Sequence, residues 1–147
     1  GVSRLVGMEI LDTGQSLEDE FSVLEHRWAD FDFFYLHVKR IDSAGEDGDF
    51  QRKVQLIEEV DAQIPRLLNL KPDVILVTGD HSTPSLLKYH GWQPVPVLLW
   101  SRYCRADRVV RFGERACMAG GLGPQIPAHH LMPLTLANAR RLDKFGA

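Results

Sequence analysis

The sequence is poor in the features that would tie a protein to a membrane, a nucleic acid or an oxidising compartment. Its apolar runs are far shorter than the roughly 20 residues of a membrane span, and no signal peptide opens it. The 17 basic residues are scattered, and the net charge is −3, which argues against a nucleic-acid partner. Cys104 and Cys117 form no CxxC pattern, and we expect reduced thiols rather than a disulfide. These absences predict a cytoplasmic protein.

The patterns that are present alternate between strand and helix. Short apolar runs at residues 5–11, 33–38, 74–77 and 94–100 predict strands. Ser16 begins a predicted helix, and a second helix is expected over residues 50–70, divided by Pro65. Residues 43–49 are interpreted as an acidic loop, and residues 132–142 as a last helix. A strand, a helix and a further strand in succession predict an α/β fold, with a largely parallel sheet flanked by helices.

Ligand-type side chains stand beside these predicted strands. Asp80 and His81 follow the strand at residues 74–77, at the end where ligands of parallel sheets bind. Asp42 and Glu46 follow the strand at residues 33–38, and His90 precedes the strand at residues 94–100. Carboxylates and imidazoles together suit divalent metal ions, and two such ions would clamp a phosphoryl group in transfer. If the strand ends share one edge, the five side chains converge.

Each of these residues also has an interpretation without a ligand role. Asp80 would then cap a polar turn, Asp42 and Glu46 would belong to a solvated loop, and His90 would be a surface histidine. The neighbours His129 and His130 point apart, which disfavours joint ligation. His37, inside an apolar run, is expected to be a hydrogen-bonded core histidine.

Four segments resemble the archaeal-type, cofactor-independent phosphoglycerate mutases of the alkaline phosphatase superfamily. They occur in the order of that family and cover essentially the whole chain. The segments are residues 36–49 (LHVKRIDSAGEDGD), 77–84 (VTGDHSTP), 90–96 (HGWQPVP) and 140–147 (RRLDKFGA). The fold that the resemblance implies is part of an alkaline-phosphatase-like core.

The resemblance implies a role for each of the five side chains. Asp42, Glu46 and His90 would bind one divalent ion, and Asp80 and His81 the other, with Mn²⁺ expected and Zn²⁺, Mg²⁺ or Co²⁺ as alternatives. Glu46 departs from the better-known bacterial relatives, which carry histidine there, and a carboxylate favours harder ions. The implied activity is that of an isomerase, which interconverts 3-phosphoglycerate and 2-phosphoglycerate through a phosphoserine.

Family members are far longer than this chain, and their N-terminal half supplies the serine nucleophile. No segment here resembles that serine motif, so we expect no catalytic nucleophile among these residues. Residues 1–15 would be the tail of an inserted domain or a linker, and residues 16–147 the C-terminal part of the metal-binding domain. A missing N-terminal half or partner chain, or self-association, would cover the exposed sheet. The chain alone is expected to be inactive.

Two other functions stay open. One is a phosphatase or phosphonate hydrolase of the same superfamily, with the same ligands and another substrate. The other is a non-catalytic metal-binding assembly domain.

Overall fold

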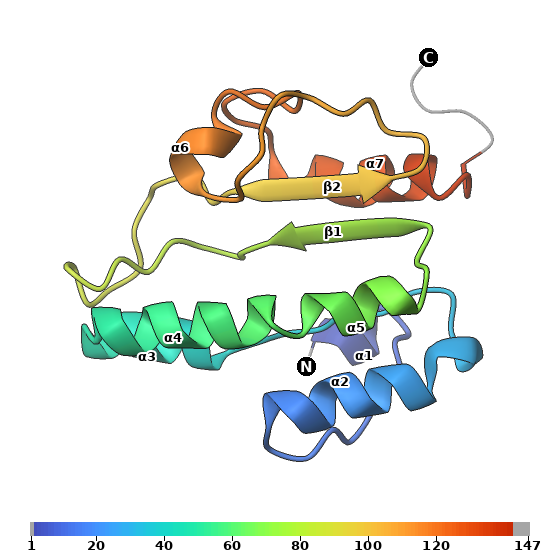
Figure 1. The fold of residues 1–147 in the computed structure, drawn as a ribbon, viewed down its shortest axis with the longest axis horizontal. Coiled ribbons are helices and arrows are strands. Elements are labelled where there is room, and N and C mark those ends of the chain that lie inside the picture. Colours follow the sequence, from blue (N-terminus) through green and yellow to red (C-terminus); the bar gives the residue numbers. More distant parts are fainter. Residues whose placement is uncertain (1, 143–147) are drawn as a thin grey trace. The chain divides into compact units, whose positions relative to one another are not determined.

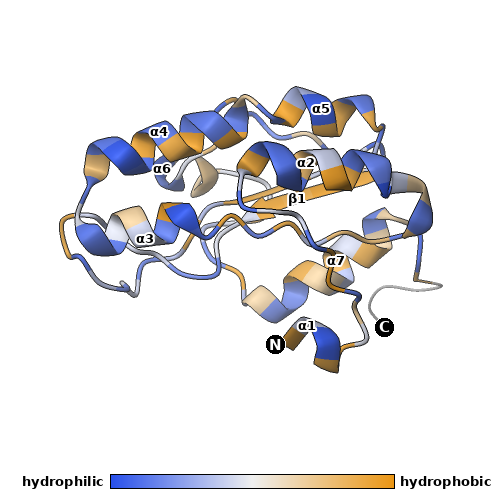
Figure 2. Cartoon of the chain, turned by 90° about the horizontal axis from the view of Figure 1, so that it is seen from below, coloured by the Kyte–Doolittle hydropathy of each residue, from blue (hydrophilic) through white to orange (hydrophobic). Residues whose placement is uncertain are grey.

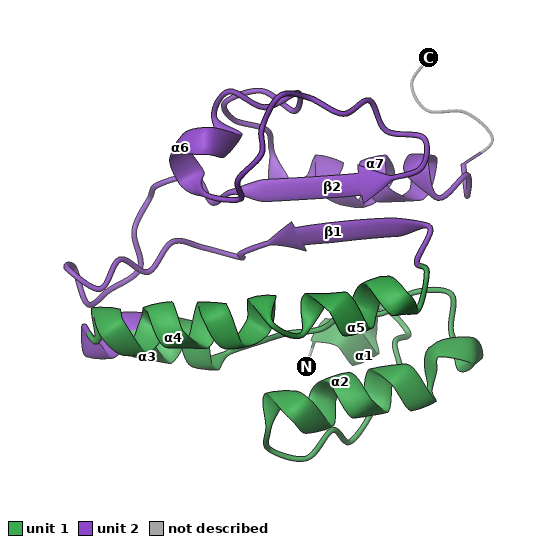
Figure 3. Cartoon of the chain, in the orientation of Figure 1, with its two compact units in different colours: residues 1–44, 49–71 green, residues 45–48, 72–147 purple. Residues whose placement is uncertain are grey.

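The computed structural model describes residues 2–142, and the last five residues of the 140–147 motif therefore lie outside the described residues (Figure 1). The chain divides into two compact units (Figure 3). Unit 1 comprises residues 1–44 and 49–71, and unit 2 comprises residues 45–48 and 72–147. The predicted boundary between residues 15 and 16 stays a prediction.

Unit 1 is helical. Its second helix begins at the predicted cap, because the Ser16 hydroxyl accepts a hydrogen bond from the Asp19 N–H and the Asp19 carboxylate accepts one from the Ser16 N–H. The helices of the chain up to residue 71 are α1 (Val2–Leu5), α2 (Leu17–His26), the 3₁₀ helix η1 (Trp28–Asp30), α3 (Arg40–Asp47), α4 (Phe50–Asp61) and α5 (Ile64–Asn69). The division between the units passes through α3.

The predicted break at Pro65 is confirmed. Pro65 stands in the first turn of α5, where the missing N–H costs no intrahelical bond, and α4 ends before it at Asp61. Apolar and polar residues alternate around α4 and α5 (Figure 2), as helices with one buried face require.

The core of unit 1 contains Phe21 and Leu24 of α2 and Leu56 of α4, each at most 5% exposed. Arg66 of α5 reaches α2, where its guanidinium donates to both carboxylate oxygens of Glu25 at 2.8 and 2.6 Å. The same guanidinium lies over the Phe21 ring. The Arg66 hydrogen bonds hold the pKa of Glu25 below its ordinary value of 4.5. Apolar burial and paired charges together join α2 to α5.

Two predicted strands of unit 1 are wrong. Residues 5–11 leave α1 through a turn at Gly7, whose φ of +79° is not that of a strand. Residues 33–38 belong to no strand of the described chain. Their aromatic rings pack locally instead: Phe34 stacks on Trp28 at 5.1 Å and meets Phe31 edge-on at 5.6 Å between ring centroids. The apolar run therefore serves an aromatic cluster.

Unit 2 is built on two strands, β1 (Val74–Thr78) and β2 (Val97–Ser101). They pair antiparallel, so that Val74 faces Ser101 and Thr78 faces Val97. The remaining elements are α6 (Glu114–Cys117), the 3₁₀ helix η2 (Ala128–His130) and α7 (Leu131–Asn138), of which α7 packs on β1. No helix in residues 2–142 has the length and apolar character to cross a membrane.

The α/β class is confirmed, but the strand direction was predicted wrongly. A parallel pair needs a crossover, usually through a helix, whereas residues 79–96 join β1 to β2 as turns and irregular chain. The chain therefore returns beside β1 in the opposite direction, and the sheet of the described residues is antiparallel.

Candidate metal centre

Asp42 and Glu46 lie on a helix, where an acidic loop was predicted. The helix α3 forms although it contains Gly45, and its Ala44 is buried (5% exposed). Gly48, with φ of +77°, ends the helix in the left-handed conformation. Asp42 in the first turn also suits the helix dipole. Residues four apart lie on the same helix face, so Asp42 and Glu46 are neighbours along α3.

Asp80 and His81 follow β1, as predicted, in a loop that is closed at its base. The Gly91 N–H donates to the Ser82 carbonyl oxygen at 2.7 Å, and these two residues form an isolated bridge. The Asp80 carboxylate accepts the His81 N–H at 3.0 Å, and its other oxygen lies 3.5 Å from His81 Nε2. The bridge brings His90, which precedes Gly91, beside His81, which precedes Ser82.

Within unit 2 the predicted residues Glu46, His81 and His90 come together. The His81 and His90 rings are 3.8 Å apart between centroids, and His90 Nε2 lies 3.4 Å from Glu46 Oε1. Asp80 adjoins them through its contact with His81. Each of the two adjacent imidazoles thus has a carboxylate beside it, and these are side chains of the kinds that bind Mn²⁺ or Zn²⁺. Asp42 belongs to unit 1, one helical turn before Glu46.

Thr83 is a site residue that the sequence interpretation missed. It is 5% exposed, and its hydroxyl lies 3.1 Å from His81 Nδ1. Ligand histidines usually engage their second ring nitrogen in this way, which fixes the ring and leaves Nε2 for an ion. The spacing of two residues from His81 was available in the sequence, but burial of the hydroxyl was not.

The other residues considered in the sequence, a serine, two cysteines and a histidine, take no part in this group of side chains. The Ser101 hydroxyl donates to Asn138 Oδ1 at 2.7 Å and accepts the N–H groups of Tyr103 and Cys104, so it is a structural hydroxyl. Cys104 and Cys117 are free thiols. The prediction of a core histidine at position 37 is wrong, because His37 is exposed and stacks on Tyr35.

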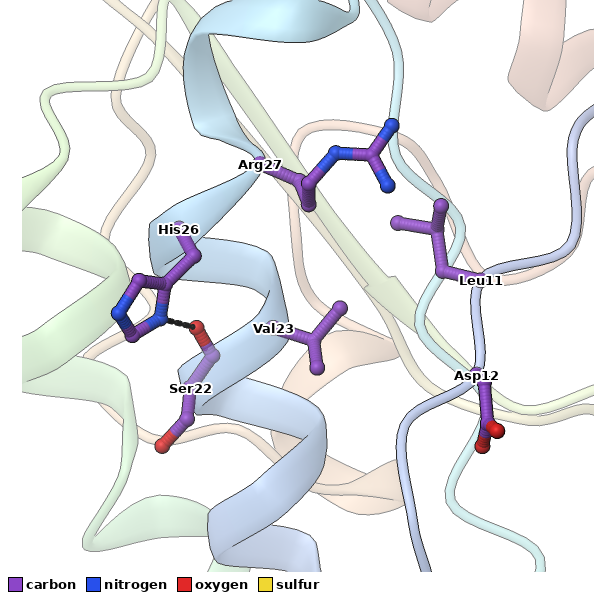
Figure 4. Close-up of a pocket in the computed structure, with 6 residues that line it drawn as sticks. All are labelled: Leu11, Asp12, Ser22, Val23, His26 and Arg27. Atoms are coloured by element: carbon purple, nitrogen blue, oxygen red, sulfur yellow. Dashed lines mark hydrogen bonds between the residues drawn. The ribbon is translucent and has the colours of Figure 1, made fainter.

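A shallow pocket in unit 1 has a different character. It is lined by Leu11, Asp12, Ser22, Val23, His26 and Arg27 (Figure 4). His26 Nδ1 donates to the Ser22 carbonyl oxygen at 2.7 Å, which holds the imidazole along α2. The lining has one carboxylate, that of Asp12, and one imidazole, that of His26, which is bonded to the backbone. It therefore offers no convergent set of metal ligands.

The sequence of this chain matches a known protein family. Residues 8–138 match the metalloenzyme superfamily, and the chain belongs to that family. Over all 147 residues it is 58% identical to a probable 2,3-bisphosphoglycerate-independent phosphoglycerate mutase of Thermotoga neapolitana, 36% of whose length it covers. A protein of the same printed name from Thermus thermophilus is 50% identical over 150 residues, with 37% of its length covered.

A solved structure is similar over nearly the whole chain. The structure of the PH0037 protein from Pyrococcus horikoshii superposes with a TM-score of 0.92 at 35% sequence identity. The match covers 99% of this chain and 47% of that one. The chain thus spans little more than a third of the length of the curated relatives and about half of the solved structure.

Proposed function

We propose that this chain is the C-terminal, metal-binding part of a phosphoglycerate mutase that interconverts 3-phosphoglycerate and 2-phosphoglycerate. The observation that carries the proposal is the approach of both Glu46 and His81 to His90, in a chain whose relatives bear that name. In this proposal the serine that carries the phosphoryl group lies outside these residues. The reaction is an isomerisation, which would place the protein in glycolysis and gluconeogenesis.

We assign the ligands to two divalent ions. Glu46 and His90 would hold one, and Asp80 and His81 the other. Asp42 would complete the first site, because α3 carries it one turn from Glu46 on the same face. When bound, two such ions neutralise charge on a transferring phosphoryl group and lower the pKa of an attacking hydroxyl. The chain's own part is to fix the donors: Thr83 orients His81, and the Ser82–Gly91 bridge places His90.

Mn²⁺ is the ion that we propose for this centre. Three carboxylates and two imidazoles make an oxygen-rich set of ligands, and such a set suits Mn²⁺. Zn²⁺ is favoured more by softer sets that contain sulfur. We expect chelator-treated full-length protein to regain most activity with Mn²⁺, and less with Zn²⁺, Mg²⁺ or Co²⁺. A protein that regains activity fully with Zn²⁺ and not with Mn²⁺ would overturn this choice.

We also propose that further protein covers unit 2, and that the full-length enzyme works in the cytoplasm. Apolar side chains of this unit are widely exposed, including Leu86 and Val110 at 92% and Trp92 at 88%. The covering residues would be the additional length that the relatives possess. The 147-residue chain alone should therefore self-associate and show no mutase activity. A clean monomer by light scattering at high concentration would contradict this.

The central test is Asp80→Ala in the full-length protein. It should abolish mutase activity, because it removes a ligand at the end of β1. Asp73→Ala is a matched control, since Asp73 is an exposed carboxylate that precedes the same strand. Full activity in Asp80→Ala, with bound metal unchanged by elemental analysis, would refute the assignment.

A further inference from the structure

Lys88 has an unusual backbone in the loop that carries His90. Its φ is +52°, a left-handed conformation that is unfavourable for a residue with a side chain. Two hydrogen bonds to the Pro84 carbonyl oxygen, from the N–H groups of Leu87 and Lys88, hold the turn at this point. Strain of this kind persists only where the surrounding structure imposes it.

The side chain of Lys88 has a close neighbour just beyond the end of α3. Its stem lies across Gly48, so closely that a Cβ atom at Gly48 would overlap Lys88 Cε and would stand 3.0 Å from Lys88 Cγ. A side chain at position 48 would have to displace the Lys88 stem. Gly48 also ends α3 in the left-handed conformation, where its N–H bonds to the Gly45 carbonyl oxygen. The stem therefore packs on the C-terminal end of the helix that carries Glu46.

The charge of Lys88 does not account for this position. Among residues 2–142, Lys88 forms no ion pair, and it is exposed to solvent. The contact consists of the aliphatic stem, as expected of a lysine whose methylene groups cover a surface while the ammonium group stays in water.

We propose that the Lys88 stem and Gly48 set the separation of His90 from Glu46, which makes both of them positioning residues. The contact lies two residues before His90 on the loop and two residues after Glu46 on α3, and it runs beside the 3.4 Å approach of those two side chains. It thus fixes loop and helix against each other next to the donors. The inference rests on the proposed function, because the separation serves the metal ion.

The test uses variants that separate the stem from the charge and from the strain. Lys88→Gly removes the stem and relieves the backbone, so it should weaken Mn²⁺ binding about 10-fold, as losses of supporting contacts do, without lowering the melting temperature. Lys88→Met keeps a stem and removes the charge, and should bind Mn²⁺ as the unsubstituted protein does. Lys71→Gly is the matched control, because Lys71 has φ of +55° in unit 1.

Gly48→Ala closes a double-mutant cycle. Alone it should displace the stem and weaken Mn²⁺ binding, but in a Lys88→Gly background it should cost no further affinity, since the same contact is already lost. Titrations are made on chelator-treated full-length protein, followed by the electron paramagnetic resonance of free Mn²⁺. Unchanged affinity in Lys88→Gly, or equal loss in Lys88→Met, would overturn the proposal.

A second measurement separates this inference from the proposed function. A crystal structure of metal-free Lys88→Gly should show His90 withdrawn from Glu46, whether or not the protein binds Mn²⁺. If the unsubstituted protein binds no Mn²⁺ while His90 still withdraws in the variant, the proposed function fails and the positioning role stands. If His90 keeps its place, the positioning role fails.

Discussion

Unit 1 and unit 2 bury different kinds of side chain. Among the described residues, the buried apolar side chains, which are those of Phe21, Leu24, Ala44 and Leu56, belong to unit 1. The buried side chains described in unit 2 are those of Thr83 and Ser101, whose hydroxyls are held in hydrogen bonds. Unit 1 therefore gains stability from apolar burial, whereas the buried hydroxyls of unit 2 fix local structure, Thr83 beside the candidate ligand His81 and Ser101 beside Asn138. Substitutions in the two units should separate stability from metal affinity.

The largest effect should come from Phe21→Ala in unit 1. Phe21 is 1% exposed, and truncating a buried phenylalanine costs about 3–5 kcal/mol of unfolding free energy. Denaturant unfolding of the full-length protein measures this, and Mn²⁺ affinity below the transition should not change. Phe50→Ala is the control, because Phe50 is 62% exposed. A loss in Mn²⁺ affinity that parallels the loss in stability would break the contrast between the units.

A smaller effect, on Mn²⁺ affinity rather than on stability, is expected for Thr83 in unit 2. Thr83→Val keeps the shape of the side chain and removes the hydroxyl from His81, so Mn²⁺ affinity should fall about 10-fold, or about 1.4 kcal/mol. Thr83→Ser keeps the hydroxyl and should retain most of the affinity. If the serine variant is as weak as the valine variant, packing rather than the hydrogen bond would be responsible.

Acid should loosen unit 2 locally, at Asp107. The N–H groups of Gly121 and Val109 donate to its carboxylate at 2.6 and 2.8 Å and hold its pKa below the ordinary 3.8. Because this pKa is lowered on folding, the stabilisation is complete above pH 3.8 and is lost as pH falls through the lower folded value. Hydrogen exchange at the Gly121 amide should accelerate there. Asp107→Asn should exchange fast at every pH, and protection that persists in this variant would contradict the role.

The smallest effect is expected at the ion pair of Arg102 with Asp73. The two groups are 3.5 Å apart and their side chains are 63% and 72% exposed, a setting in which ion pairs contribute about 0–1 kcal/mol. Asp73→Ala should therefore leave both the melting temperature and the Mn²⁺ affinity within error. A clear loss of either would show that the residue before β1 contributes more to unit 2 than its exposed position indicates.

The sequence predicted those elements whose signals are local. The Ser16 cap, the break at Pro65 and the strand β1 each follow from residues within a few positions of one another, and each is confirmed. The family resemblance likewise predicted the class of fold and the family. Four of the five candidate ligands adjoin one another in unit 2, although their role as ligands stays a prediction.

The rest depended on packing that a sequence does not display. Helix α3 looked like a loop because its helix propensity is weak. The burial of Ala44 and the end of the helix at Gly48 are visible only in the structure. The run at residues 33–38 looked like a strand because apolar content does not distinguish a sheet partner from the ring of Trp28. The contacts of Thr83 with His81 and of Lys88 with Gly48 were invisible for the same reason.

The bridge between Ser82 and Gly91 has a consequence for how this protein folds. The strands that pair in unit 2 are joined by 18 residues rather than by a short hairpin turn, so their ends must find each other across a long connection, at an entropic cost. Closing the chain at Ser82 and Gly91 shortens that search. A divalent ion bound by His81 and His90 would connect the chain at the same two points. It would therefore stabilise the pairing of β1 with β2 during folding, apart from any role in chemistry.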